Sequence, residues 1–186
     1  PGGRIVPSNP RLIVIGGFAG AGKSTLVRSV GRALGITYYE IDLVARTIAN
    51  SGDFHGSNAK GVAFDLFWTL ARAYLENGNS LVFDQNMGQP WQWGQIERVA
   101  AGVPGAEVVT FILDCPWDLC LERVEARSKH PDWSKCTVEN IHRHKHKWDY
   151  VTDNEFPGAI RIDASRSQGE VFADVMSHLD PARPHS

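Results

Sequence analysis

Short apolar runs alternate with stretches of helical periodicity along the chain. The run from Leu12 to Ile15 is continuously apolar and ends at Gly16 and Gly17, a pattern typical of a strand buried on both faces. Apolar residues then recur at helical spacing until Gly35, which supplies a stop signal. Further strands are predicted at 36–41, 81–83, 107–113 and 160–162, and further helices at 42–49, about 95–101, 117–127, 138–150 and 171–179. This alternation predicts a parallel α/β sheet with right-handed crossovers.

The longest predicted helix precedes the strand that begins at Leu81. Its apolar residues fall on one stripe, typical of a helix that packs one face against a core. They are Ala63, Leu66, Phe67, Leu70 and Tyr74. The sequence NGNS ends the helix before the strand.

Composition adds a limit on size and on partners. The chain has 186 residues, of which 42% are hydrophobic and 22% charged, as in ordinary globular domains. We expect a short tail at 1–10 and a single domain at 11–182. The formal net charge of -2 excludes a global basic field that would attract long nucleic acids, although local patches are compatible with it.

The sequence also bears on the compartment. No stretch approaches the roughly 20 apolar residues that a membrane-spanning helix needs, and the first residues show no signal-peptide pattern. Cys115, Cys120 and Cys136 are an odd number, which does not fit a disulfide scaffold. We therefore expect a cytoplasmic protein with reduced thiols, either a monomer or a homodimer, and no membrane partner.

The most specific motif lies between the first strand and the first helix. The segment from Gly17 to Ser24 reads GFAGAGKS and matches the P-loop pattern G-x-x-x-x-G-K-[ST] at every fixed position. In this context glycines let successive N–H groups face one point, and the helix presents its positive end there. A triphosphate is the natural ligand: Lys23 can bridge its β- and γ-phosphates, and the Ser24 hydroxyl can bind Mg²⁺. The candidate nucleotide-binding residues here are Gly20, Ala21, Gly22, Lys23, Ser24 and Thr25.

Other residues narrow the class of P-loop protein. The chain has no N-K-x-D motif, which a GTPase would use to read its base, and no long apolar run ending in Asp-Glu, as in a motor ATPase. Acidic residues at Glu40 and Asp42 and the pair Arg123 and Arg127 accompany the P-loop. With them, residues 11–180 resemble the P-loop small-molecule kinases, a group that includes shikimate and gluconate kinases, chloramphenicol phosphotransferase, zeta toxins and polynucleotide 5′-kinases.

The resemblance implies a fold and a reaction. It implies a five-stranded parallel sheet in the order 2-3-1-4-5 flanked by helices, with a short lid at about 127–138. It also implies an ATP-dependent kinase that uses ATP and Mg²⁺ and transfers the γ-phosphate to a hydroxyl group. The acceptor is expected to be a small molecule, a metabolite or an antibiotic.

The end of the second strand carries the candidate base. In the related kinases this strand ends in an acidic pair spaced by one residue, and here the pair is Glu40 and Asp42. The resemblance implies that Asp42 orients or accepts the proton of the attacking hydroxyl. The alternative role for Asp42 is a helix N-cap. Arg46, four residues on, shares its helix face and either holds an anionic substrate group or pairs with Asp42.

The third predicted strand ends at a second carboxylate. Asp84 follows Leu81-Val82-Phe83 at the place where related P-loop proteins bind Mg²⁺ or the acceptor. Gln85 and Trp91 follow in the expected acceptor lip. The alternatives are a turn or cap role for Asp84 and ordinary surface packing for Trp91. The predicted metal ligands are therefore Ser24 and Asp84.

Two arginines precede the expected lid. Arg123 and Arg127 are four residues apart and share a helix face, where the resemblance implies that they contact the nucleotide and its γ-phosphate. The alternative is a surface pairing with neighbouring glutamates. The segment from Ile162 to Ser165 resembles the loop that flanks adenine, so Ser165 is a further nucleotide-binding candidate.

One basic segment is compatible with more than one class of phosphate acceptor. Residues 142–147 read HRHKHK. They form either a solvated face or a patch that attracts substrate phosphate. A kinase acting on a nucleoside or a nucleic-acid hydroxyl is therefore an alternative, although the overall charge favours a small molecule. Another alternative is a non-catalytic ATP-binding regulatory module or a zeta-toxin-like protein.

Overall fold

A single sheet of five parallel strands forms the centre of the molecule, in the order β2-β3-β1-β4-β5. The computed structural model describes residues 9–52, 55–128 and 137–179. The strands are β1 (Arg11–Gly17), β2 (Thr37–Tyr39), β3 (Leu81–Gln85), β4 (Glu107–Asp114) and β5 (Ile160–Asp163). The predicted fold class and strand order are confirmed. Because β1 is central and buried, the loop that follows it opens at the middle of the sheet edge.

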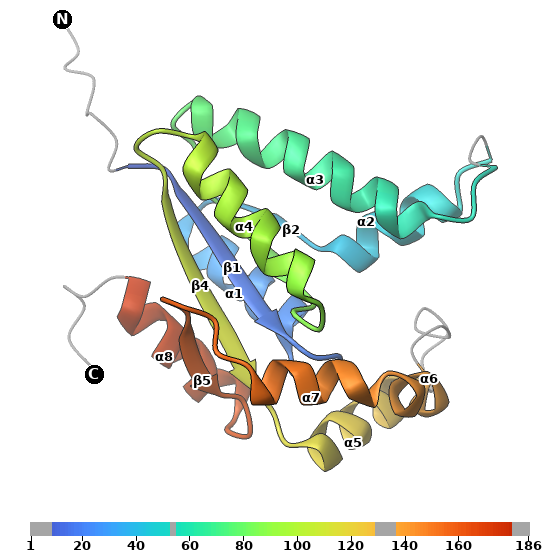
Figure 1. Cartoon of the computed structure of the whole chain (residues 1–186). Coiled ribbons are helices and arrows are strands. Elements are labelled where there is room, and N and C mark those ends of the chain that lie inside the picture. Colours follow the sequence, from blue (N-terminus) through green and yellow to red (C-terminus); the bar gives the residue numbers. More distant parts are fainter. Residues whose placement is uncertain (1–8, 53–54, 129–136, 180–186) are drawn as a thin grey trace, which may run out of the picture.

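Helices cover both faces of the sheet (Figure 1). They are α1 (Lys23–Leu34), α2 (Ile41–Ala49), α3 (Ala59–Glu76), α4 (Pro90–Gly102), α5 (Trp117–Ser128), α6 (Val138–Arg143), α7 (Lys145–Asp153) and α8 (Gln168–Leu179). One apolar cluster joins β1 to α1, α5 and α8, and the other joins it to α3 and α4. The alternation of side chains along β1 explains the two clusters, because Ile13 and Ile15 face one layer and Leu12 and Val14 the other.

Several predicted boundaries are wrong. The second strand ends at Tyr39, and Ile41 already begins α2. The helix predicted at about 95–101 begins at Pro90, because proline has the backbone angle of a first helical residue and lacks only an N–H that no bond would use. The helix predicted at 138–150 is two helices, since His144 ends α6 and precedes α7.

The buried face of α3 also differs from the predicted stripe. Ala63 and Phe67 are buried as expected, but Leu66, Leu70 and Tyr74 are 42%, 39% and 37% exposed. The helix is apolar over much of its circumference, so spacing alone does not select a face. Tertiary contact selects it: the ring of Phe67 stacks on Phe83 of β3 with centroids 3.9 Å apart.

The structure bears on the expectations about membrane spans, cysteines and the lid only within the residues that it describes. No helix among the described residues combines the length and apolarity needed to span a membrane. Cys115 and Cys120 form no disulfide, in agreement with reduced thiols, whereas Cys136 lies outside the described residues. Most of the predicted lid at about 127–138 also lies outside them.

Candidate active site

The P-loop depends on glycines. Gly20 and Gly22 have φ angles of 90° and 96°, a region that L side chains rarely adopt. A Cβ atom added to Gly20 would lie 2.6 Å from the Cys120 carbonyl oxygen, so the start of α5 leaves no room for a side chain there. The first turn of α1 contains no acidic residue. The loop therefore presents backbone N–H groups and an uncompensated positive helix end at one place.

The P-loop lysine arches back over its own loop. The Lys23 ammonium donates a hydrogen bond to the Phe18 carbonyl oxygen at 2.8 Å. Burial lowers the pKa of Lys23, while the carboxylates of Asp84 and Asp42 act in the opposite direction. Lys23 thus lies within the electrostatic reach of both acidic candidates, as a lysine that neutralises transferred phosphate charge must.

Asp84 is held beside the P-loop by the register of the sheet. Its Cα pairs with that of Ile15 on β1. Its Oδ2 accepts a hydrogen bond from the Ser24 hydroxyl at 2.9 Å, and its Oδ1 accepts one from the Ile41 amide at 3.0 Å. Only 4% of Asp84 is exposed, and burial raises its pKa even though Lys23 and these hydrogen bonds lower it. The site therefore holds a buried carboxylate with incomplete charge compensation.

Ser24 and Asp84 fit a magnesium ion that arrives with a nucleotide. Mg²⁺ takes oxygen ligands and usually binds through one or two protein groups, with water and phosphate oxygens filling the other positions. A hydroxyl and a carboxylate 2.9 Å apart supply such a pair. Within the described residues no group of three or more His, Cys, Asp or Glu side chains could hold a metal by itself. The predicted metal pair is brought together, and its metal occupancy remains a prediction.

Asp42 lies in the first turn of α2. The N-cap of that helix is Glu40, so the alternative that Asp42 is the cap is wrong. The Lys60 ammonium donates to Asp42 Oδ1 at 2.7 Å, and 63% of the Asp42 side chain is exposed. Partial desolvation raises the pKa of Asp42, but Lys60 above all, with Lys23 and Arg46, lowers it below the ordinary value. Asp42 is therefore an ionised, accessible carboxylate that already has a cationic partner.

The first acidic position has a different environment. Glu40 Oε1 lies 3.2 Å from Arg28 Nε on α1. Burial raises the pKa of Glu40, and Arg28 opposes this effect. This ion pair gives Glu40 a role in holding the start of α2 against α1.

The expected acceptor lip is not assembled as predicted. Successive residues of β3 point to opposite faces, so Asp84 meets Ser24 of α1 whereas Gln85 meets Gln92 of α4. Gln85 is 1% exposed, and Gln92 Nε2 donates to its Oε1 at 3.5 Å. Trp91 is half-exposed and packs edge-on against Phe64 of α3, which agrees with surface packing. The structure brings neither Gln85 nor Trp91 to the Asp84 side of the sheet.

Arg123 and the loop after β5 lie together. Arg123 Nη1 donates to the Ala164 carbonyl oxygen at 3.1 Å and contacts Cys115 Sγ at 3.6 Å. The next residue, Ser165, donates through its hydroxyl and its amide to Asp163. Arg127 donates through Nε to the Arg123 carbonyl oxygen at 3.2 Å. The two nucleotide candidates Arg123 and Ser165 thus flank one loop, and Arg127 is the second-last residue of α5.

Three contacts near the site were not anticipated from the sequence, although Lys147 belongs to the basic segment at 142–147. Lys60 pairs with Asp42, Cys120 limits Gly20, and the stem of Lys147 lies so close to Gly88 that a Cβ there would be 2.6 Å from Lys147 Cβ. Only Lys60 carried a usable signal, because it sits just inside the start of α3, where the helix dipole disfavours a cation. The other two depend on tertiary contacts between distant segments.

Sequence comparison places most of the chain in one family. The AAA domain family, designated AAA_33, matches residues 12–149. Curated relatives in Mycobacterium bovis and Mycobacterium tuberculosis, all described as uncharacterized proteins, are 31% identical over 129 residues. That match covers 63% of this chain and 26% of each relative, so the chain spans about a quarter of their length.

Structural comparison agrees with the topology. A protein of Chloroflexus aurantiacus provisionally described as a kinase has a TM-score of 0.70 at 16% identity, covering 95% of this chain and 99% of that one. A gluconokinase from Sinorhizobium meliloti scores 0.59 at 14% identity, with 95% and 94% covered. Shikimate kinase from Acinetobacter baumannii, in complex with shikimate, scores 0.56 at 14% identity, with 96% and 97% covered. The chain therefore belongs to the AAA domain family, and its fold is that of the P-loop kinases.

Proposed function

We propose that the protein is an ATP-dependent phosphotransferase that moves the γ-phosphate of ATP to a hydroxyl group of a small molecule. The observation that carries the proposal is the pair of carboxylates with different environments beside one P-loop lysine. Asp84 is buried and hydrogen-bonded to Ser24, whereas Asp42 is exposed and reaches Lys23 electrostatically. A protein that only binds nucleotide has no need of the second, accessible carboxylate.

Each residue then has a distinct task. The P-loop amides and Lys23 hold the β- and γ-phosphates of ATP, and Ser24 and Asp84 hold the Mg²⁺ that ATP brings, which neutralises phosphate charge. Asp42 accepts the proton of the acceptor hydroxyl. The acceptor oxygen forms a bond to the γ-phosphorus, and the bond from that phosphorus to the bridging oxygen breaks, so its electron pair leaves with ADP.

Arginines complete the proposed nucleotide site. Arg123 lies against the loop that contains Ala164 and Ser165, where it supports the adenine-flanking role of that loop. Arg127 follows one turn later, in the last turn of α5, and is assigned to the γ-phosphate. Closure of this region over ATP would exclude water that otherwise hydrolyses it.

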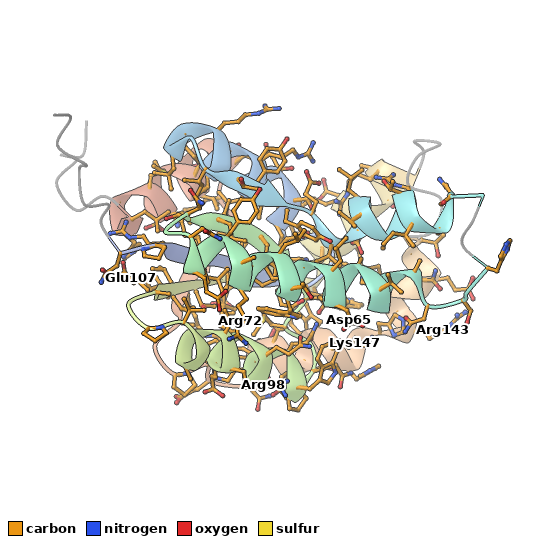
Figure 2. The ribbon with its side chains drawn as sticks, turned by 90° about the horizontal axis from the view of Figure 1, so that it is seen from above. Asp65, Arg72, Arg98, Glu107, Arg143 and Lys147 are labelled. Atoms are coloured by element: carbon orange, nitrogen blue, oxygen red, sulfur yellow. The ribbon has the colours of Figure 1, made fainter. Side chains whose placement is uncertain are left out.

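A nucleic-acid hydroxyl is the second candidate acceptor. Lys147 favours it, because its stem packs against Gly88 in the loop after β3, and a cation there matches the phosphates of a polynucleotide. In Figure 2, Lys147 and Arg143 lie toward the beginning of α3, whereas Arg72 lies toward its other end. The overall charge of -2 favours the small molecule.

The test is a screen for acceptor-dependent ADP release. Purified protein with ATP and Mg²⁺ is presented with hydroxylated metabolites, aminoglycosides and other antibiotics, nucleosides, and DNA or RNA ends. We expect ADP formation above the acceptor-free rate with a member of the small-molecule set, and a phosphorylated product by mass spectrometry. Isothermal calorimetry of ATP with and without Mg²⁺ is measured alongside. Nucleotide binding without any acceptor-dependent ADP would contradict the proposed activity.

A further inference from the structure

The proposed base is paired with a lysine in this structure. Lys60 Nζ lies 2.7 Å from Asp42 Oδ1, which is hydrogen-bond distance between two full charges. A carboxylate that neutralises an ammonium is a weaker proton acceptor, because the cation stabilises its ionised form. An acceptor hydroxyl must therefore either share Asp42 with Lys60 or displace it.

The Lys60–Asp42 ion pair can separate at little energetic cost. The side chains of Lys60 and Asp42 are 54% and 63% exposed, and exposed ion pairs contribute only about 0–1 kcal/mol. Lys60 is the second residue of α3, after the N-cap Asn58, so the positive end of the helix acts against its charge. The fold gains little from a lysine at this position. Its presence is easier to explain by the carboxylate it faces than by helix stability.

More cations face Lys60 from the opposite side of the strand ends. Figure 1 shows α2 and the beginning of α3 on one side of this edge, and α5, α6 and α7 on the other. His144, between α6 and α7, has a pKa lowered by burial and then by Lys147 and other nearby cations, and Lys60 is among them. Lys60 and His144 therefore lie within electrostatic range of each other, although they come from opposite sides of the edge.

The charge on this second side is not balanced. Arg143 pairs with Glu139 and Lys145 pairs with Asp149, which neutralises these two cations locally. Within the described residues, the Lys147 ammonium has neither an ion pair nor a hydrogen bond, and its stem packs against Gly88 in the loop that follows Asp84 and β3. An uncompensated cation thus lies next to the segment that leaves the catalytic edge.

We propose that Lys60 is a charge-sensing residue that restricts the reaction to small hydroxylated anions, whose carboxylate or phosphate takes Lys60 from Asp42 and so frees the base. The inference rests on the proposed function and names its substrate class. An uncharged alcohol offers Lys60 no replacement for the carboxylate, so Asp42 stays paired. An anionic alcohol satisfies Lys60 with its own charge, and Lys147 adds attraction from the other side.

The charged groups around Asp42 define what a pH profile would report. They are Lys60 from α3, Lys23 from α1, Arg46 from α2, Glu40 before α2 and Asp84 from β3. Lys60 has the largest pKa-lowering effect among them. Removal of Lys60 should therefore move the acid limb of the kcat/KM profile to higher pH, a change that a merely structural lysine would not produce.

The experiment compares matched acceptors with and without charge. D-gluconate is paired with D-glucitol for a carboxylate, and glycerol 3-phosphate with glycerol for a phosphate, with ATP and Mg²⁺ present. ADP release gives kcat/KM for each compound, and the two pairs distinguish the two kinds of anion. We expect turnover of a charged member and a preference over its neutral partner of about ten- to a hundredfold, the value of a hydrogen bond to a charged group.

Three variants separate the roles. Lys60→Gln should reduce that preference at least tenfold and move the acid limb of the kcat/KM profile to higher pH. Lys147→Gln should raise KM for the charged acceptor and leave the acid limb at the same pH. Arg72→Gln is the control, since Arg72 is also an exposed cation of α3 with an ion pair, to Glu76 at 2.7 Å, and should change neither quantity. Thermal melts verify that each variant folds.

The outcomes are distinguishable. Equal turnover of charged and neutral partners, or an unchanged preference and pH profile in Lys60→Gln, would overturn the charge-sensing role and leave the kinase intact. Absence of acceptor-dependent ADP with every compound in both this set and the wider screen would overturn the proposed function, and the inference with it.

Discussion

The two sides of the proposed site, one for the nucleotide and one for the acceptor, are built in different ways. On the nucleotide side, backbone angles, a buried carboxylate and a hydroxyl are fixed by neighbouring segments of the sheet. On the acceptor side, Asp42 and Lys60 are exposed side chains that lie 18 residues apart in sequence, on two different helices. The first region is held by the fold, and the ligand proposed for it is common to many enzymes. The second can be altered by one substitution without disturbing the fold, and it is where specificity can change.

Substitution of the acceptor-side carboxylate should give the largest effect. Asp42→Asn removes the proposed base, and we expect acceptor-dependent turnover to fall by about 10²–10⁴-fold, the usual contribution of general base catalysis. The affinity for ATP with Mg²⁺ should stay within a few-fold, because Asp42 does not line the P-loop. Steady-state ADP release and calorimetry measure the two quantities. Full turnover in this variant would remove Asp42 as the base.

Substitution of the P-loop lysine should affect both regions. Lys23→Met removes the ammonium that faces the phosphates, and turnover should fall by about 10²–10³-fold, as for other preorganised charge donors. ATP binding should weaken as well, which distinguishes it from Asp42→Asn. Arg32→Met, on the exposed part of the same helix, is the control. Turnover in Lys23→Met that matched this control would contradict the P-loop role.

A backbone change should test the rigidity of the nucleotide side. Gly20→Ala places a methyl group 2.6 Å from the Cys120 carbonyl oxygen at a φ of 90°, so we expect a loss of about 1–3 kcal/mol in the free energy of unfolding and weaker ATP binding. The matched change Gly94→Ala, in open space within α4, should stabilise the protein by up to about 1 kcal/mol. Urea unfolding measures both. Equal effects would mean that the loop is not constrained as described.

The smallest effect should appear in titration. Asp84 and Asp42 should titrate on opposite sides of an ordinary aspartate, because burial raises the pKa of Asp84 and Lys60 chiefly lowers that of Asp42. Asp42 then contributes stability at neutral pH that is lost as the pH falls through its folded pKa. Asp84 contributes stability at low pH that is lost as the pH rises through its folded pKa.

Carboxyl NMR, assigned with single Asn variants, would measure both midpoints. The stability part of the prediction concerns Asp42→Asn. That variant should be less stable than the original protein by at most about 1 kcal/mol at pH 7, since the pair is exposed. The difference should vanish in acid. Coincident midpoints for the two carboxylates would remove the electrostatic difference between the regions.

The same division explains what could be predicted from the sequence. The P-loop follows from a local pattern, whereas the strand order, and with it the proximity of Ser24 and Asp84, is implied by the resemblance to the P-loop kinases together with the rule that parallel strands end at one edge. The motifs that carry the resemblance lie within short segments, so one sequence contains them. The apolar run at Leu12 to Ile15, for example, leads directly into the loop it positions.

What could not be predicted depends on how helices rotate and meet. The predicted buried face of α3 is wrong because apolar residues nearly encircle the helix. The contact of Phe67 with Phe83 decides how the helix is rotated about its axis. The separation of Asp84 from Gln85 requires the bounds of β3 to the residue, which the apolar run ending at Phe83 did not give. The position of Lys60 in α3 is unusual for a cation, but its partner Asp42 depends on how α2 and α3 pack together, which no local pattern encodes.

The alternation along β3 has a consequence for how this site can evolve. A single residue deleted between Leu81 and Phe83 would shift the rest of the strand by one position, so that the amide of Gln85 would replace the carboxylate opposite Ser24. Loops around the edge can lengthen or shorten freely, but this strand tolerates no change in length. Descendants of this chain can therefore acquire new acceptors through their helices and loops, while β3 must keep its residue count.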